Sequence, residues 1–394
     1  MTTYSAVVTT GIYCRPGCRA RPRAENVRTF GLAAGAEAAG FRACLRCRPY
    51  RTAGPLAADA PELVCRAVQL IIEGVLDSGT EAALGARLAV SPRHLRRVFN
   101  GHLGMTPDQL ARSRRAHFAR RLLDDTDMAV ADVAFASGFA SLRQFNRQMR
   151  EVFRAAPSEL RARRRLADRL AADGGLTMRL PLQPPFDWDA TAEFFAKRAV
   201  PGVESVSGGV CRRTISLDGA PGMLEIRLGG ADHLLLRAHL PYWEGLIHVA
   251  ERAGRMAGTD VSPEVRAPGA WGPFEAAVEA VVAQECDAPG MARAQLGRIA
   301  ERFGPHVPGL THGLVRLFPS AEVLAAGNLT GLNLPPATAT ILAALAAGTA
   351  SGQIALGHSV SHADLISSLT AVAGIRPATA SQIALRLGHR QVPS

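Results

Sequence analysis

The spacing of apolar residues divides the chain into a helical stretch, an alternating stretch and a second helical stretch. From Leu63 onward, apolar side chains recur at steps of three and four residues, which predicts amphipathic helices. The helical spacing returns at Trp271. Between these stretches the pattern alternates and predicts strands over residues 209–217, 223–228 and 234–240. We therefore predict a multidomain α+β protein.

The first helical stretch contains two similar units about 50 residues apart. In the first unit, a helix over residues 81–88 is followed by a short turn and by a second helix capped by Ser91. In the second unit, residues 130–136 precede a turn and a helix capped by Ser141. A long helix that begins with a capping box at Thr106 joins the units. This order predicts an all-α domain with two helix-turn-helix units.

Charge is concentrated in the same region of the chain. The 394 residues include 45 basic and 34 acidic ones, a net charge of +11, and residues 1–170 hold 28 Arg against 15 acidic residues. This excess predicts a polyanion partner for the N-terminal part. The N-terminus lacks a signal-peptide pattern, and the apolar segment 337–347 is too short to span a bilayer. We expect a soluble, cytoplasmic protein with no membrane partner.

Four of the seven cysteines form two close pairs, Cys14 with Cys18 and Cys44 with Cys47. Two such pairs in a cytosolic chain favour a zinc site over disulfides. Zn²⁺ accepts four thiolates tetrahedrally, and a short turn within each pair can direct two sulfurs at one metal. Spacing alone favours a structural role, because closed four-cysteine sites are mostly structural.

The residues around these cysteines resemble the N-terminal zinc domain of Ada-type adaptive-response proteins. The match covers residues 8–50 and is carried by residues 11–22, 25–30 and 38–49. In that family, the zinc-bound thiolate of the first cysteine takes the methyl group of a methylphosphotriester in DNA. The resemblance implies that Cys14 is the methyl acceptor. It also implies that Zn²⁺ is the cofactor, with the ligands Cys14, Cys18, Cys44 and Cys47.

Methylation of one ligand would change the charge of such a centre. Four thiolates on Zn²⁺ carry a net charge of about −2, and converting one of them to a thioether leaves about −1. The centre then repels DNA phosphates less strongly, so the affinity for DNA should rise. Nearby arginines could hold phosphates, although a solvated arginine surface is the alternative. The candidates are Arg15, Arg42, Arg46 and Arg48.

The double unit resembles the AraC-type DNA-binding domain, above all at residues 134–139 and 145–147. In such motifs the second helix of each unit enters the major groove, and successive grooves lie about 34 Å apart. Arginine suits guanine and asparagine suits adenine. The alternative is a helical bundle with a charged surface. The candidates for base contacts are Arg93, Arg96, Arg143, Asn146 and Arg147.

The second half resembles the 3-methyladenine DNA glycosylase II family at residues 185–188, 274–278 and 369–375. The resemblance implies a small α+β domain followed by a helix-hairpin-helix. Several positions depart from the family pattern: the second hairpin glycine, the following tryptophan, a pocket tyrosine and the apolar wedge are here Arg376, Ala378, Gln382 and Glu285. No acidic residue follows Asp364, so the catalytic aspartate of the family is not found. We therefore expect this half to be truncated, degenerate and inactive in base excision.

These observations predict a DNA alkylation sensor that activates transcription. Its expected partners are double-stranded DNA and RNA polymerase, and we expect a monomer. Three alternatives stay open: a bifunctional enzyme that also excises alkylated bases, a transcription factor with a structural zinc site, and a truncated product that folds in part. We expect a zinc domain, an AraC-type domain, a glycosylase N-terminal-like domain and a helix-hairpin-helix domain over residues 1–51, 60–166, 177–266 and 267–394.

Overall fold

The N-terminal part of the protein is a small sheet with one short helix against it. The structure, a computed structural model, describes residues 3–20, 22–52, 60–170, 174–259, 268–286 and 288–389. The strands lie in the order β3-β1-β2-β4; β1 is antiparallel to β2 and β3, whereas β2 and β4 are parallel. Helix α1 (Ala33–Ala38) packs on this sheet. The strands are β1 Tyr4–Val7, β2 Ile12–Cys14, β3 Val27–Phe30 and β4 Arg42–Ala43.

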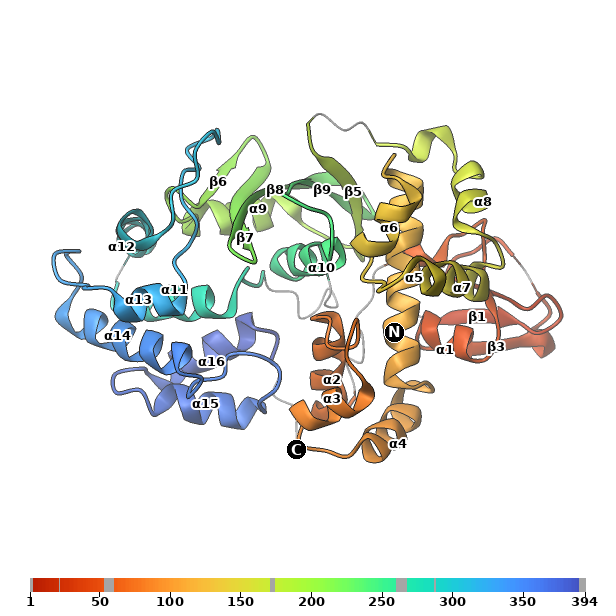
Figure 1. Cartoon of the computed structure of the whole chain (residues 1–394), viewed down its shortest axis with the longest axis horizontal. Helices are drawn as coiled ribbons and strands as arrows, with labels where there is room; N and C mark the ends of the chain where they lie inside the picture. The colour runs from red at the N-terminus through yellow and green to blue at the C-terminus, as the bar shows by residue number, and fades with distance from the viewer. Residues whose placement is uncertain are drawn as a thin grey trace.

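The next part is all α-helical and is organised around α5 (Pro107–Asp125). Its capping box at Thr106 forms as predicted, and its 19 residues make a rod about 28 Å long. Figure 1 shows α5 running between the first helix-turn-helix unit at one end and α6 at the other. The remaining helices are α2 Glu62–Ile72, α3 Glu81–Arg87, α4 Pro92–Leu103, α6 Val130–Ala136, α7 Leu142–Phe153 and α8 Pro157–Ala162.

The third part is an antiparallel five-stranded sheet in the order β5-β9-β8-β7-β6. Helices α9 (Trp188–Arg198) and α10 (Leu246–Ala257) accompany it, and α10 lies between the sheet and the helical part (Figure 1). Alternation along β9 buries Leu234, Leu236 and Ala238. The strands are β5 Leu176–Pro181, β6 Glu204–Ser207, β7 Val210–Leu217, β8 Ala220–Gly230 and β9 His233–His239.

The last part is again helical and has its own apolar core. Two similar sequence strings begin at Pro336 and Pro377, and each opens a helix, as their proline at the first helical position predicts. The helices are α11 Pro273–Gln284, α12 Pro289–Phe303, α13 Ala321–Ala326, α14 Pro336–Ala350, α15 His362–Thr370 and α16 Pro377–Arg386. The predicted fold class is thereby confirmed.

Two local predictions differ from the structure. Strand β5 was not predicted; its first residue, Leu176, pairs with Ala238. The short strand β6 was not predicted, because its sequence is mostly polar and pairing with β7 is what makes it a strand.

The first three parts share one apolar core. Tyr13 of the small sheet, Phe118 of α5 and Leu236 of β9 belong to a single cluster of buried side chains. Burial of apolar surface between domains holds them together at roughly 25 cal/mol per Å². The orientation of the zinc domain on α5 is therefore part of the fold.

Candidate zinc centre and DNA-binding helices

The paired cysteines meet at one end of the N-terminal sheet. Cys14 ends β2, and the parallel pairing of β2 with β4 brings Cys44 beside it, where the Cys44 N–H donates to the Tyr13 carbonyl at 3.0 Å. The left-handed Gly17 (φ 73°) turns the chain back before Cys18. The sulfur atoms of four cysteines lie within 4.8 Å of one another: Cys14, Cys18, Cys44 and Cys47. Cys14 is buried, and the other three are half-buried.

The geometry and chemistry of the sulfur cluster fit Zn²⁺. A tetrahedral site with Zn–S bonds of about 2.3 Å places its sulfurs about 3.8 Å apart. A hydrogen bond to Cys47, together with burial, raises the pKa of the Cys14 thiol. Accepting that bond lowers the pKa of Cys47 to about 5. Zinc binding displaces thiol protons of this kind and leaves thiolate ligands.

A buried hydrogen-bonded group connects the centre to α5. The Tyr13 hydroxyl donates to Oε1 of Glu37 at 2.5 Å, and Nε2 of His117 lies 2.6 Å from the same oxygen. Burial raises the pKa of Glu37, but the charge and hydrogen bond of His117 outweigh it and lower that pKa. Burial, followed by the charge of Glu37, raises the pKa of Tyr13. The residue before Cys14 is thus linked to the helix that joins the two helix-turn-helix units.

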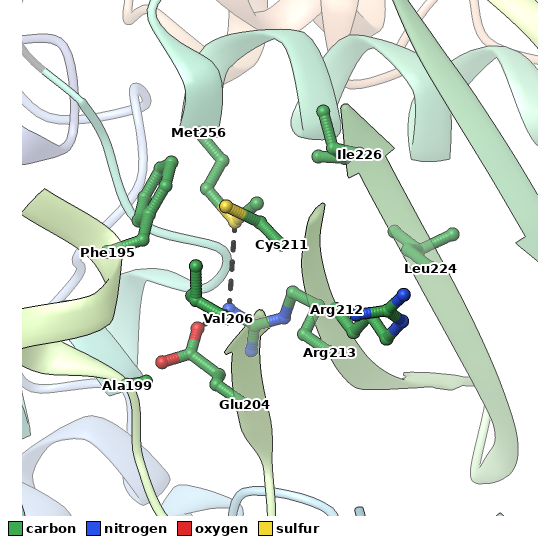
Figure 2. Close-up of a pocket in the computed structure, with 10 residues that line it drawn as sticks. All are labelled: Phe195, Ala199, Glu204, Val206, Cys211, Arg212, Arg213, Leu224, Ile226 and Met256. Carbon is green, nitrogen blue, oxygen red and sulfur yellow. Dashed lines mark hydrogen bonds and ion pairs between the residues drawn. The ribbon is translucent and has the colours of Figure 1, made fainter. Parts of the chain in front are cut away.

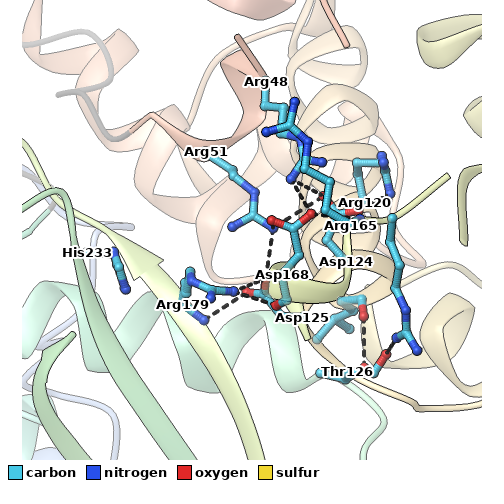
Figure 3. Close-up of polar contacts among 12 residues, drawn as sticks. Arg48, Arg51, Arg120, Asp124, Asp125, Thr126, Arg165, Asp168, Arg179 and His233 are labelled. Carbon is cyan, nitrogen blue, oxygen red and sulfur yellow. Dashed lines mark hydrogen bonds and ion pairs between the residues drawn. The ribbon is translucent and has the colours of Figure 1, made fainter. Parts of the chain in front are cut away.

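The segment after Cys47 is held by carboxylates at the end of α5 (Figure 3). The Arg51 guanidinium lies 2.9 Å from Oδ1 of Asp125 and 3.3 Å from Oδ2 of Asp124. Arg48 donates to Oδ2 of Asp168 at 2.6 Å. Both carboxylates on α5 are fully buried, and removing one partner of such a pair costs about 3–5 kcal/mol. This cluster anchors the zinc domain.

The same carboxylates reach the five-stranded sheet. The backbone N–H of Arg179 on β5 donates to Oδ2 of Asp125 at 2.9 Å, and its guanidinium donates to Oδ1 at 2.8 Å. The Tyr50 hydroxyl donates to Asp124 at 2.9 Å. Sequence reasoning missed this junction. The available signal was the acidic pair Asp124-Asp125 at the end of an otherwise basic helix.

The arginines predicted to hold phosphates are placed differently from one another. Arg46 is exposed, and Arg15 and Arg42 are half-buried near the cysteines. The Arg48 side chain is only 11% exposed and is committed to Asp168. Arg48 is therefore not free to hold a phosphate in this arrangement, because it serves as an interdomain anchor. For the other three, the DNA contact stays a prediction.

The second helices of both helix-turn-helix units present their predicted contact residues outward. On α4, Arg93 is exposed, and Arg96 is also exposed although it pairs with Glu81. On α7, Arg143 and Arg147 are exposed, and Asn146 is half-buried. The Ser91 and Ser141 hydroxyls cap these helices, each accepting a backbone N–H at 3.2 Å. The outward faces therefore keep the basic residues accessible.

The helix-hairpin-helix departures meet in space. Nε2 of Gln284 donates to the Gly374 carbonyl at 2.8 Å, so the end of α11 holds the hairpin. The Arg376 guanidinium donates to the Glu285 carboxylate at 2.9 Å and to the Gln284 carbonyl at 2.9 Å. Ala378 and Gln382 are exposed on α16. Two substitutions relative to the family pattern thus compensate each other's charge.

The α+β domain contains a cavity that is too small for a base. Its cavity, drawn in Figure 2, has a volume of only about 10 Å³, enough for about one water molecule. Beside it, the buried Arg213 donates to both Glu275 oxygens at 2.9 Å and to Glu204 at 2.8 Å. Burial raises the pKa of Glu275 to about 7. This ion pair ties β7 to α11 and is structural.

The four sulfurs lie in a domain that is docked on two exposed helix-turn-helix units. Together with the second half of the chain, this arrangement defines a zinc-containing DNA-binding protein with glycosylase-like domains. Family models match residues 2–50 (metal binding domain of Ada), 84–163 (helix-turn-helix domain) and 177–267 (AlkA N-terminal domain). The predicted Zn²⁺ cofactor and the predicted resemblances are thereby confirmed. Within the described residues, no helix is both long and apolar enough to cross a membrane.

Relatives match this chain over different shares of its length. A Mycobacterium tuberculosis protein named a probable bifunctional transcriptional activator/DNA repair enzyme AlkA is 35% identical, with 97% of this chain and 82% of the relative aligned. The Escherichia coli bifunctional transcriptional activator/DNA repair enzyme Ada is 36% identical over 41% of this chain and 47% of its own length. A solved 3-methyladenine DNA-glycosylase from Archaeoglobus fulgidus is 21% identical, covers 54% of this chain and 80% of that one, and has a TM-score of 0.46. The chain belongs to the family of bifunctional transcriptional activator/DNA repair proteins.

Proposed function

We propose that this protein senses alkylated DNA by accepting, once, the methyl group of a methylphosphotriester on Cys14, and that it then activates transcription. The observation that carries the proposal is the meeting of four sulfurs in a domain that matches the metal binding domain of Ada. That domain is docked on the helix that joins two DNA-binding units.

The chemistry is a displacement at carbon. The Cys14 sulfur donates an electron pair to the methyl carbon, the carbon–oxygen bond breaks, and the phosphodiester leaves with its negative charge restored. Bound Zn²⁺ keeps the sulfurs deprotonated at neutral pH and therefore nucleophilic. The product thioether does not revert, so each chain acts once.

Methylation then changes how the protein meets DNA. The centre loses one negative charge, which weakens repulsion of phosphates and raises affinity. Arg93 and Arg96 on α4 and Arg143, Asn146 and Arg147 on α7 would read bases in successive major grooves. Because one chain carries both units, we propose that it binds as a monomer and recruits RNA polymerase.

Mass spectrometry tests the acceptor. Zinc-loaded protein incubated with methylphosphotriester DNA should gain about 14 Da on the peptide that contains Cys14. Cys65→Ser, which changes a cysteine outside the cluster, should gain the same mass, whereas Cys14→Ser should gain none. A Cys14→Ser protein that still binds zinc and still activates transcription after alkylation would show that the zinc site is only structural.

We also propose that the second half does not excise bases. Arg376 and Glu285 pair at the hairpin, and Ala378 and Gln382 present no aromatic wall on the exposed face of α16. The second candidate function, excision of alkylated bases, is favoured by the repair activity in the relatives' names. Release of free 3-methyladenine from alkylated duplex DNA by Cys14→Ser protein would establish excision and overturn this part of the proposal.

A further inference from the structure

A charged cleft separates the first helix-turn-helix unit from the second half of the protein. It has a volume of about 340 Å³ and is lined by residues of α2, α3, α10 and α16. Its lining has an excess of positive charge, with four arginines against two glutamates. These are Arg87, Arg252, Arg255, Arg386, Glu73 and Glu251.

Most of these charges already have partners. Arg386 lies 2.6 Å from Glu279, and Glu251 lies 2.9 Å from Arg114. Glu73 lies 2.7 Å from His358 and 3.9 Å from Arg255, which also donates to Gln69 at 3.0 Å. Arg87 and Arg252 make no ion pair or hydrogen bond with any residue in the described ranges. Both guanidinium groups are exposed and lack a close acidic partner among the described residues, although the more distant charges of Glu73 and Glu275 act on Arg252.

Arg252 is exposed at the cleft, but an aromatic ring restrains its guanidinium. Its guanidinium lies 5.0 Å from the centre of the buried Trp271 ring, within cation–π distance. Burial lowers the pKa of Arg252, and the nearby Arg255 lowers it further. A bound anion would stabilise this charge. Because the ring already restrains the side chain, less conformational entropy would be lost on binding.

We propose that this cleft binds the phosphate group of a small molecule, held between Arg87 and Arg252. The planar guanidinium fork matches phosphate oxygens in a bidentate manner, and two guanidinium groups without a close acidic partner suit a phosphate dianion. The volume lies in the range of small-ligand sites, about 300–1,000 Å³, and is far too small for a DNA duplex. Such a ligand would bridge α3 of the first DNA-binding unit to α10 of the second half.

Calorimetry on the zinc-loaded full chain tests the site with inorganic phosphate and with adenosine monophosphate. Each ligand that binds should give a saturable 1:1 isotherm, and Arg252→Gln or Arg87→Gln should weaken it by about tenfold. The matched control is Arg163→Gln, an exposed arginine outside the cleft that should bind as the wild type does. Far-UV circular dichroism checks that each variant is folded.

The outcomes identify the source of the phosphate. Tighter binding of adenosine monophosphate would assign a phosphate ester, and tighter binding of inorganic phosphate would assign the free ion. Absence of saturable binding by both up to about 10 mM would overturn the proposal. Unchanged affinity of folded Arg252→Gln for the phosphate ligands would also overturn the proposal. So would a result in which the two arginines affect the binding of duplex DNA alone. Methyl uptake by Cys14 is independent of each result.

Discussion

Tyr13 connects the sulfur cluster to α5 through its backbone and its side chain. Its backbone carbonyl accepts the Cys44 N–H beside the sulfur cluster, while its hydroxyl donates to Glu37. Glu37 in turn meets His117 of α5. A change in the strand that carries Cys14 can therefore alter contacts on α5 directly.

Tyr13→Phe should lower the free energy of unfolding by about 1–3 kcal/mol. The substitution keeps the buried ring but removes a donor from a buried carboxylate, whose lost hydrogen bond is not replaced by water. Tyr242→Phe is the matched control, because its hydroxyl donates to Asp218 at 2.8 Å on the exposed surface. The control should change stability by less than about 0.5 kcal/mol in urea denaturation. Equal effects of the two substitutions would contradict the role given to the buried group.

His389 should make stability depend on pH. It is buried and stacked on His358, with ring centres 4.9 Å apart, near His362, Arg66 and Glu73. Burial, and then the charge of His358, lowers its pKa to about 3. The unfolded chain, with a histidine pKa of about 6.5, takes up this proton first as the pH falls. The stabilisation is present above about pH 6.5 and is lost as the pH falls toward 3.

Urea denaturation between pH 7 and pH 5 measures this effect. The free energy of unfolding should fall with a contribution from His389 of up to about 1.4 kcal/mol per pH unit. His389→Gln, which cannot titrate, should give a shallower slope. Parallel pH curves for the two proteins would show that His389 does not take up the proton.

Among the elements, α5 sets the geometry of DNA recognition. It is about 28 Å long; α4 lies near one end, whereas α7 packs beside its middle, where Phe153 lies against His117 (Figure 1). Successive major grooves on one face of DNA are about 34 Å apart. That the two outward basic helices bind neighbouring grooves stays a prediction.

Arg143→Ala should weaken promoter binding at one position of the site more than at others. Loss of a bidentate arginine contact to guanine costs about 1–3 kcal/mol of discrimination. Fluorescence anisotropy with a promoter series should show the loss confined to one half-site. Arg302→Ala, on α12 of the second half, should leave the affinity unchanged. A uniform loss across all sequences would instead indicate a phosphate contact.

The sequence predicted elements whose causes are local. The serine caps of α4 and α7, the capping box of α5 and the two cysteine pairs act over three or four residues, so their patterns are visible in the chain. The anchoring of Arg48 by Asp168 joins residues 120 positions apart and depends on which surfaces dock. Likewise, Glu285 and Arg376 were each recognised as departures from a family pattern. Only the fold shows that they pair.

At the scale of the molecule, Asp125 is the point where three parts meet. It accepts from Arg51 of the zinc domain and from Arg179 of the five-stranded sheet, and it ends α5 itself. The carboxylate is fully buried between these partners. The three parts should therefore behave as one cooperative unit.

Asp125→Asn should loosen both interfaces at once. Loss of the charge leaves Arg51 and Arg179 without a full counter-charge, at a cost of about 3–5 kcal/mol. Limited proteolysis should then release the zinc domain and the second half from the helical part faster than in the wild type. Asp127→Asn, two residues away and half-exposed beside Arg164 and Arg169, should cost less than about 1 kcal/mol. Similar proteolysis of the two variants would contradict the cooperative unit.

The Asp125 junction makes the five-stranded sheet a support of the zinc domain. In a shortened chain that lacks β5, the buried Asp125 carboxylate would lose its partner Arg179. The zinc domain, which this carboxylate anchors, would then be destabilised. Selection for alkylation sensing alone would then be enough to preserve the sheet as a structural support, whether or not the second half has a catalytic role.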